Sequence, residues 1–488
     1  MTIQLNDPSL LRTRAYIDGD WCDSDGTTTF AVTNPANGDE IARVADCGAA
    51  ETRRAIEAAA RAMKDWRART AKERSVVLRR WYELIMENQE DLAILMTLEQ
   101  GKAIAESRAE VAYGASFIEW FSEEAKRVYG DIIPPPQSDR RVVVIKQPVG
   151  VAAAITPWNF PNAMITRKAG PALAVGCSIV IKPASATPLS ALALAELADR
   201  AGVPAGVLNV ITGKDTRAIG GEITSNPIVR KLSFTGSTEI GKELTRQCAG
   251  TLKRTSMELG GNAPVIVFND ADLDAAVAGA AASKYRNSGQ TCICANRLLV
   301  QDGVYDAFVE KLTELVGSYR LGNGLDEATT HGPLVSETAV EDVDAFVRDA
   351  LEKGARAPIG GRRSELGSCY YEPTVLTDVT EDMRVFNEEI FGPVAPVFRF
   401  RTEEEAIAMA NDTPYGLASY FYTRDLGRAW RVAEAIEYGL VGVNEVAITS
   451  DVIPFGGVKE SGQGREGSKY GIDDYVEIKY ICMGGIDR

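Results

Sequence analysis

Two cysteines lie one residue apart, Cys292 and Cys294, in the segment NSGQTCICANR at residues 287–297. A single C-x-C pair lacks the second pair of ligands that a structural zinc site requires, so we expect no metal site here. A cysteine attacks as its thiolate, which a neighbouring base or dipole must generate. The one histidine of the chain, His331, lies in an ordinary loop sequence, TTHGPL, where a structural or solvated role is the commoner case. The base is therefore expected to be a carboxylate.

Glu258 is the candidate for that carboxylate. It lies in the segment MELGGN, just before two glycines at the expected end of a strand, where backbone can approach a ligand closely. Taken singly, the thiol would be interpreted as a small buried side chain and the acid as a surface residue. Cys292 after the polar turn GQT, combined with this acid, favours covalent catalysis with a carboxylate base.

Two strand–helix connections suggest a dinucleotide site. The segment FTGSTEIG places Gly236 and Gly241 where a strand ends and a helix begins, and helix N-termini suit a pyrophosphate. The segment is not G-x-G-x-x-G, so an ordinary glycine-rich turn fits it equally well. In KPAS, Lys182 and Ser185 are placed to reach an adenosine ribose, although an ordinary connection has the same pattern.

The elements that must position these residues alternate between strand and helix. A short buried strand is expected at 178–183 and a helix at 186–202, with Thr187 as its N-cap. Repeated βα units predict a mainly parallel sheet with helices on both faces. The alternation of strands and helices is interrupted near 255–262, which is a candidate domain junction.

Two strands are predicted outside this alternation. The proline-rich segment 131–139 leads into an alternating strand near 141–147, and the tail alternates again at 476–482. An unpaired strand exposes N–H and C=O groups that favour pairing with another strand. These two strands therefore predict an annex that pairs with something, for example another subunit.

Bulk properties exclude several classes of protein. The chain has 488 residues with a net charge of −15, so nucleic acid and anionic membranes are not expected partners, and an anionic substrate would need a local cluster of arginines. Its 45% hydrophobic content is that of a soluble globular protein, and its length predicts two to four domains. Eight scattered cysteines and a start without a signal-peptide core predict a reducing, cytoplasmic location.

Five motifs occur together in the order of a known family: TPWNFP (156–161), FTGS (234–237), MELGG (257–261), GQTC (289–292) and EEIFGP (388–393). On these motifs the chain resembles the aldehyde dehydrogenase superfamily over essentially its whole length. Longer stretches, such as SKYRNSGQTCICANR and PFGGVKESGQGREGSKYG, resemble its succinate-semialdehyde dehydrogenase branch.

The resemblance implies a particular architecture of the α/β class. It has two doubly wound α/β domains and a small β annex for oligomerisation. The resemblance places a Rossmann-type cofactor domain at 1–128 and 148–260, a catalytic domain at 261–460, and the annex at 129–147 and 461–488. It also implies a homo-oligomer, either a dimer or a tetramer built from dimers.

The resemblance also implies a role for each motif. Cys292 is the nucleophile that forms a thiohemiacetal and then a thioester, Asn159 and the Cys292 N–H hold the oxyanion, and Glu258 activates the hydrolytic water. Glu389 anchors the nicotinamide ribose. The positions that match cofactor contacts are Thr156, Trp158, Lys182, Ser185, Gly236, Ser237, Leu259, Glu389 and Phe391.

The choice of cofactor and substrate follows from the same resemblance. Ser185 stands where NAD-preferring members often carry an acid, so NADP is favoured, with NAD also used. Arg167 and Arg286 match two arginines that bind a distal carboxylate. The loop 444–457 departs from the branch pattern, yet Thr449 and Ser450 keep hydroxyls there.

Several alternatives remain open. Succinate semialdehyde is the first choice of substrate, and glutarate semialdehyde or a short sulfonated aldehyde of the sulfolactaldehyde type is the second. An inactive relative that serves as a binding or structural protein is a remote alternative, against which intact Cys292, Glu258 and Asn159 argue. Cys294 is either a small core residue or the partner of Cys292 in a redox switch.

Overall fold

Two large β-sheets form the framework, and the computed structural model describes residues 4–486. The strands of the first sheet are β1 (Ala15–Ile17), β2 (Asp20–Cys22), β7 (Val151–Ile155), β8 (Ile179–Lys182), β9 (Leu208–Val210), β10 (Val229–Thr235), β11 (Arg254–Glu258) and β19 (Gly462–Gln463). Their order is β19-β11-β10-β7-β8-β9-β1-β2. The central five strands are parallel to one another, and β19, β1 and β2 pair antiparallel at the edges.

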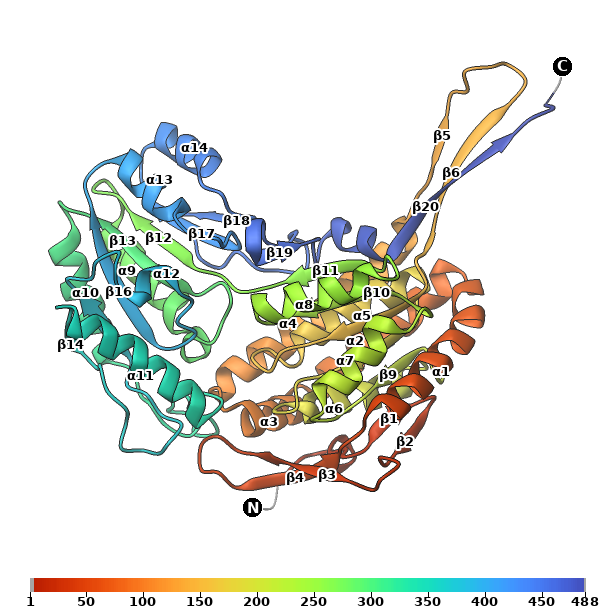
Figure 1. The fold of residues 1–488 in the computed structure, drawn as a ribbon, viewed down its shortest axis with the longest axis horizontal. Helices are drawn as coiled ribbons and strands as arrows, with labels where there is room; N and C mark the ends of the chain where they lie inside the picture. Colours follow the sequence, from red (N-terminus) through yellow and green to blue (C-terminus); the bar gives the residue numbers. More distant parts are fainter. Residues whose placement is uncertain (1–3, 487–488) are drawn as a thin grey trace.

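Helices cover both faces of this sheet (Figure 1). They are α1 (Ala49–Ala68), α2 (Ala71–Glu87), α3 (Gln89–Gln100), α4 (Ile104–Glu124), α5 (Ala163–Val175), α6 (Pro188–Arg200), α7 (Thr216–Ser225) and α8 (Thr238–Ala249). Alternate residues of β7 enter different cores. Ala152 and Ala154 pack in a cluster with residues of α4, α5 and α6, whereas Ala153 packs in one with residues of α1, α7 and α8. Burial on both sides explains why these parallel strands are continuously apolar.

The second sheet repeats the arrangement. Its strands are β12 (Ala263–Val267), β13 (Ala295–Gln301), β14 (Arg356–Ile359), β15 (Thr374–Thr377), β16 (Val394–Phe400), β17 (Ala418–Tyr422) and β18 (Leu440–Val443), in the order β14-β15-β16-β13-β12-β17-β18. Its helices are α9 (Leu273–Tyr285), α10 (Tyr305–Gly317), α11 (Glu337–Glu352), α12 (Arg384–Asn387), α13 (Glu403–Asn411) and α14 (Leu426–Ala435). Val265 and Ile266 of β12 enter different cores. The prediction of two doubly wound α/β units is therefore confirmed.

Shorter elements complete the chain. They are β3 (Thr29–Thr33), β4 (Glu40–Ala45) and the 3₁₀ turns η1 (Pro8–Leu10), η2 (Ala125–Arg127), η3 (Arg286–Gly289), η4 (Lys459–Ser461) and η5 (Lys469–Tyr475). Within residues 4–486, no helix combines the length and the apolar character that crossing a membrane requires.

A three-stranded sheet projects from the body as an arm (Figure 1). It consists of β5 (Asp131–Ile133), β6 (Arg141–Pro148) and β20 (Val476–Met483), so the two predicted lone strands exist and pair antiparallel with each other. Apolar side chains on it are exposed, with Ile132 82% and Ile478 71% accessible. Residues 462–463 fall inside the range predicted for the annex, yet they form β19 of the first sheet.

One local prediction needs correction. Thr187 stands at the N-cap position of α6, but its side chain makes no capping hydrogen bond to the described chain. The first N–H groups of α6 instead bond to the buried Glu99 carboxylate, Leu189 N at 2.7 Å and Ser190 N at 2.8 Å. A carboxylate from α3 therefore replaces the expected local cap.

Candidate active site

The nucleophile turn and the turn that follows β11 lie against each other. Cys292 is half-buried between η3 and β13, and a Cβ atom at Gly261 would lie only 2.5 Å from the Cys292 carbonyl oxygen. A glycine is therefore required for the GQTC and MELGG turns to approach so closely. Burial, with the charges of Glu389 and Glu258, raises the pKa of the Cys292 thiol to about 12, against the pull of Arg167. The resting thiol consequently needs a base.

Glu258 is placed to be that base. It is the last residue of β11 and is only 3% exposed, and neither of its carboxylate oxygens finds a hydrogen-bond partner within residues 4–486. Burial and the nearby charge of Glu466 raise its pKa well above the usual value, although Arg167 opposes them. A free carboxylate with a raised pKa has the properties of a general base.

Asn159 reaches the nucleophile turn from the first sheet. It lies between β7 and α5, and its Nδ2 donates to the Gln290 carbonyl at 2.9 Å, two residues before Cys292. Its own carbonyl accepts from Lys102 Nζ at 2.7 Å and from Asn287 Nδ2 at 3.0 Å. The Asn159 side chain is thus held against the turn that carries Cys292.

The loop that leads to Cys292 has an unusual backbone. Asn287 and Ser288 have φ values of 50° and 54°, which non-glycine residues rarely adopt. The surrounding chain fixes them. Asn287 N donates to Glu106 Oε1 at 2.7 Å, and Ser288 Oγ donates to the Gly332 carbonyl at 2.8 Å. Strain that is maintained in this way is typical of functional sites.

Four of the expected cofactor residues lie at the carboxyl ends of neighbouring parallel strands. They are Thr156 after β7, Lys182 at the end of β8, Gly236 after β10 and Leu259 after β11. Ligands of open α/β sheets bind at this edge. Ser185 is half-buried in the connection from β8 to α6, and Ser237 is the N-cap residue of α8. Burial lowers the pKa of Lys182 to about 8.

Of the remaining cofactor residues, Glu389 and Phe391 lie between α12 and β16 of the second unit, whereas Trp158 lies between β7 and α5 of the first. Glu389 Oε1 accepts from Gly261 N at 3.0 Å, and burial raises its pKa to about 7. The rings of Trp158 and Phe391 meet edge to face at 5.6 Å. The Thr156 hydroxyl is buried and makes no hydrogen bond to any described residue. A free hydroxyl, a half-buried serine and a helix N-terminus along one strand edge fit a nicotinamide dinucleotide.

The two candidate arginines occupy different environments. Arg167 on α5 is only 2% exposed, and its Nε lies 2.8 Å from Glu466 Oε2, with the Phe455 ring 4.1 Å from its guanidinium carbon. Arg286 is half-buried and lies over the Phe160 ring at 5.0 Å. Sequence reasoning missed Glu466, although it lies in a segment that carried the family resemblance.

Tyr113 on α4 is a second residue that sequence reasoning missed. Burial raises its pKa, and the charges of Arg167 and Arg286 and a hydrogen bond with Thr449 oppose the rise. Tyr113 packs against Phe117, which Arg167 overlies, and against the cluster of Phe160, which Arg286 overlies. Ser450 instead uses its Oγ to accept from Val452 N at 3.2 Å.

Cys294 is buried and is a free thiol, as Cys292 is. Its Sγ donates to the Arg286 carbonyl at 3.8 Å. Burial raises its pKa, against the charge of Lys284 and a hydrogen bond from Thr291. The redox role of Cys294 stays a prediction.

His331 has a packing role. Its ring lies 4.2 Å from Tyr319 and meets Tyr285 edge to face at 6.1 Å. Burial lowers its pKa to about 4. It is therefore neutral at physiological pH and packed among aromatic rings.

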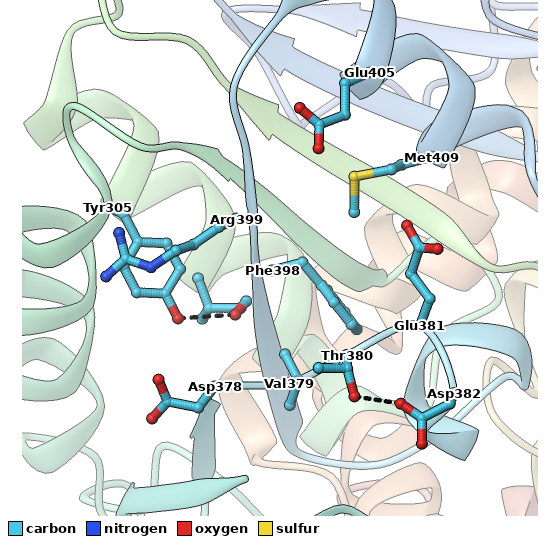
Figure 2. Close-up of a pocket in the computed structure, with 11 residues that line it drawn as sticks. Tyr305, Asp378, Val379, Thr380, Glu381, Asp382, Phe398, Arg399, Glu405 and Met409 are labelled. Carbon is cyan, nitrogen blue, oxygen red and sulfur yellow. Dashed lines mark hydrogen bonds between the residues drawn. The ribbon is translucent and has the colours of Figure 1, made fainter. Parts of the chain in front are cut away.

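A separate cleft of about 590 Å³ opens on the second α/β unit (Figure 2). The side chains that line it include Tyr305, Arg399 and four acids, which are Asp378, Glu381, Asp382 and Glu405. None of the predicted site residues is among its lining residues. In the part of the chain that is described, no three His, Cys, Asp or Glu side chains are grouped to hold a metal ion.

The aldehyde dehydrogenase family model matches residues 21–481. A glutarate-semialdehyde dehydrogenase of Pseudomonas aeruginosa is 63% identical over 484 residues, covering 99% of this chain and 100% of the relative. A 3-sulfolactaldehyde dehydrogenase of Pseudomonas putida is 61% identical, covering 100% of both chains. The NADP⁺ succinate-semialdehyde dehydrogenase of Escherichia coli is 62% identical, covering 99% and 100%.

Solved structures agree with these relatives. A succinate-semialdehyde dehydrogenase from Burkholderia pseudomallei superimposes with a TM-score of 0.98 at 60% identity, covering 98% of this chain and 99% of that one. Motifs, fold and relatives point to one conclusion. The chain belongs to the aldehyde dehydrogenase family and is an NAD(P)-dependent enzyme that oxidises aldehydes.

Proposed function

We propose that the substrate is a short aldehyde with a distal anionic group, and that succinate semialdehyde is the first candidate. One observation carries the proposal: Tyr113 packs against Phe117 and against the Phe160 cluster, and these are the rings that Arg167 and Arg286 overlie, at 5.4 Å and 5.0 Å. Two guanidinium groups near one phenol suit a carboxylate or sulfonate. The names of the relatives, which all specify such aldehydes, support it.

In the proposed mechanism Cys292 adds to the aldehyde carbonyl and forms a thiohemiacetal. Negative charge develops on the former carbonyl oxygen, where Asn159 Nδ2 and the Cys292 N–H stabilise it. A nicotinamide dinucleotide, when bound, supplies the acceptor for the hydride. Loss of that hydride from the substrate carbon leaves a thioester on Cys292.

Glu258 acts at both ends of this sequence. Its free carboxylate takes the proton of Cys292, releases it to solvent, and later takes a proton from the water that hydrolyses the thioester. A raised pKa makes the carboxylate a stronger base than an ordinary glutamate, while burial keeps other water away.

We propose NADP as the preferred cofactor, with NAD also used. Ser185 and Lys182 would hold the adenosine ribose, since a hydroxyl with a nearby lysine tolerates a 2′-phosphate that a carboxylate would repel. Gly236 and Ser237 would hold the pyrophosphate, and Glu389 the nicotinamide ribose. Thr156, Trp158, Leu259 and Phe391 would line the rest of the site.

Assembly and location are further parts of the proposal. The exposed apolar sheet of β5, β6 and β20 would bridge subunits in a dimer or a tetramer. The cofactor domain, catalytic domain and annex would follow the predicted limits, with β19 inside the cofactor sheet. Eight free thiols fit a reducing cytoplasm.

A panel of aldehydes assayed with both cofactors tests the proposal. It contains succinate semialdehyde, glutarate semialdehyde, a sulfonated aldehyde and neutral aldehydes of matched length. We expect the highest kcat/KM for the four-carbon acid with NADP. Equal kcat/KM for the neutral aldehydes would overturn the anion site, and a higher value for either other acid would select that substrate.

A further inference from the structure

One face of α4 contacts both halves of the reaction centre. Glu106, Glu110, Tyr113 and Phe117 recur at intervals of three or four residues, which places them on the same side of the helix. Glu106 bonds to the loop before Cys292, Glu110 bonds to the start of α5, and Phe117 lies 5.4 Å from the Arg167 guanidinium carbon. The helix is thus in a position to fix these segments relative to one another.

Lys102 and Glu110 form a buried ion pair next to Asn159. Lys102 Nζ lies 2.5 Å from Glu110 Oε2, and each side chain is only 1% exposed. The same ammonium donates to the Asn159 carbonyl at 2.7 Å and lies 4.0 Å from the centre of the Phe160 ring. Charges removed from water in this way persist only when they are paired and hydrogen-bonded.

The second oxygen of Glu110 holds the main chain a few residues further on. Glu110 Oε1 accepts from Asn162 N at 3.0 Å and from Ala163 N at 3.2 Å, at the start of α5. The ion pair therefore hydrogen-bonds to the main chain on both sides of Phe160. One contact is with the carbonyl of Asn159 and the other is with the first N–H groups of the helix that carries Arg167.

The Asn159 carbonyl also joins this pair to the nucleophile loop. Asn287 Nδ2 donates to it at 3.0 Å, and Asn287 N donates to Glu106 Oε1 at 2.7 Å. The left-handed backbone of Asn287 is thus held from α4 and from Asn159 together. A shift of the Asn159 main chain would move its amide relative to Cys292.

We propose that Lys102 and Glu110 are positioning residues for aldehyde oxidation, which fix the main chain of Asn159 so that its amide meets the oxyanion. The inference rests on the oxyanion role proposed for Asn159. Lys102 bonds to the Asn159 carbonyl and Glu110 to the chain beyond it, so both act through the asparagine.

The test compares Lys102→Met with Lys231→Met, a matched loss of another fully buried lysine, whose Nζ lies 3.8 Å from Asp474 Oδ1. Single-turnover formation of reduced cofactor should slow by about tenfold to a hundredfold in Lys102→Met, because small misplacements of catalytic groups have effects of this size. The Kd of the cofactor should stay unchanged, and Lys231→Met should keep its rate. Equal losses in the two variants would overturn the proposal.

A double-mutant cycle separates positioning from general damage. If Lys102 acts through the amide, the single-turnover rate of Asn159→Ala/Lys102→Met should be within about twofold of that of Asn159→Ala alone. Once the amide is absent, loss of Lys102 has no further effect through it. Losses that multiply would contradict the proposal. A near wild-type rate in Asn159→Ala would instead remove the proposed oxyanion role, whatever Lys102→Met does.

A second variant guards against misfolding. Lys102→Met leaves the Glu110 carboxylate buried without its cation, so Lys102→Met/Glu110→Gln removes both charges and serves as the reference if the single variant is insoluble. It should show the same rate loss as Lys102→Met. When it is combined with Asn159→Ala, it should again add no further loss. Failure of both variants to fold would mean that the pair maintains the fold, and the positioning role would be rejected.

Discussion

The Arg167 guanidinium is ion-paired with Glu466, with Nε 2.8 Å from Oε2 and both side chains almost fully buried. The second oxygen of Glu466 pairs with Lys168, which also donates to Thr235 Oγ1 at 2.7 Å. Glu466 therefore shares its negative charge between two cations. In the proposed anion site, a substrate anion would meet an Arg167 that is already partly neutralised, whereas Arg286 stacks on Phe160.

Replacement of Arg286 is the cleaner test of the anion site. Arg286→Ala should raise KM for the acid aldehyde by about tenfold to a hundredfold, because a charge-assisted hydrogen bond contributes about 1.5–3 kcal/mol. A neutral aldehyde of equal length should be affected far less. Arg424→Ala, which removes an exposed arginine paired with Asp272, is the control. Equal losses for both aldehydes would mean that Arg286 is only structural.

Arg167→Ala should show the same selectivity with an added loss of stability. Removal of one partner of a buried pair typically costs about 3–5 kcal/mol. The remaining contact of Glu466 with Lys168 should place the loss near the lower end. Thermal unfolding beside the KM values checks this, and an unchanged Tm would show that the Arg167–Glu466 contact contributes little.

Glu258→Gln should separate the two halves of the reaction. An amide cannot accept a proton from water, so thioester hydrolysis should slow by about 10²- to 10⁴-fold. Single-turnover mixing should still give a burst of reduced cofactor, although a slower one, because Cys292 loses its base and only its ionised fraction forms the thioester. Cys292→Ala should give neither burst nor turnover while it binds cofactor normally. A raised KM with unchanged kcat in Glu258→Gln would assign Glu258 to binding.

The pH dependence of kcat should report the same carboxylate. Burial and Glu466 raise the pKa of Glu258, and a base works only when deprotonated, so activity should increase with pH through that raised pKa. Glu466→Gln removes a negative neighbour of Glu258 and lowers its pKa. The rising limb of the kcat–pH profile should therefore shift to lower pH. Glu437→Gln, which removes an exposed acid paired with Lys459, should leave the limb in place. A limb that does not move in Glu466→Gln would assign it to another group.

Some of these relationships were readable from sequence and others were not. MELGG follows β11 of the first sheet, whereas GQTC precedes β13 of the second, so the order of strands within one sheet does not predict that the two turns meet. The motifs of the family resemblance predicted that Cys292 and Glu258 act together. The pairing of Arg167 with Glu466 joins residues far apart in the chain, and local patterns do not encode it. Glu99 replaced Thr187 as the cap of α6 for the same reason.

The arm should control assembly. Ile478 and Tyr480 of β20 are 71% and 62% exposed, and such apolar strands are normally covered. Removal of residues 476–488, or Ile478→Asp with Tyr480→Asp, should therefore give a smaller and less stable particle. Leu252→Asp, at a leucine that is 91% exposed elsewhere, should not change the mass. An unchanged mass in light scattering after the arm substitutions would remove the arm from the interface.

The last prediction concerns Cys294. Peroxide oxidises the Cys292 thiolate to a sulfenic acid, and the Cys294 thiolate can then attack that sulfur, expel hydroxide and close a disulfide. Cys294 is buried and its Sγ donates to the Arg286 carbonyl, so this hydrogen bond must break before the Cys294 sulfur attacks. A ring of this size is tight, and strained disulfides are readily reduced.

Peroxide should therefore inactivate the enzyme, and dithiothreitol should restore it. Cys294→Ala should still lose activity, but prolonged peroxide should carry its Cys292 on to sulfinic acid, from which thiols cannot recover it. Cys248→Ala removes a buried thiol distant in sequence from the nucleophile turn, and it should behave as the wild type. Peptide mass spectrometry should find the Cys292–Cys294 disulfide only where both thiols are present. Full recovery of Cys294→Ala after prolonged peroxide would leave Cys294 with a packing role alone.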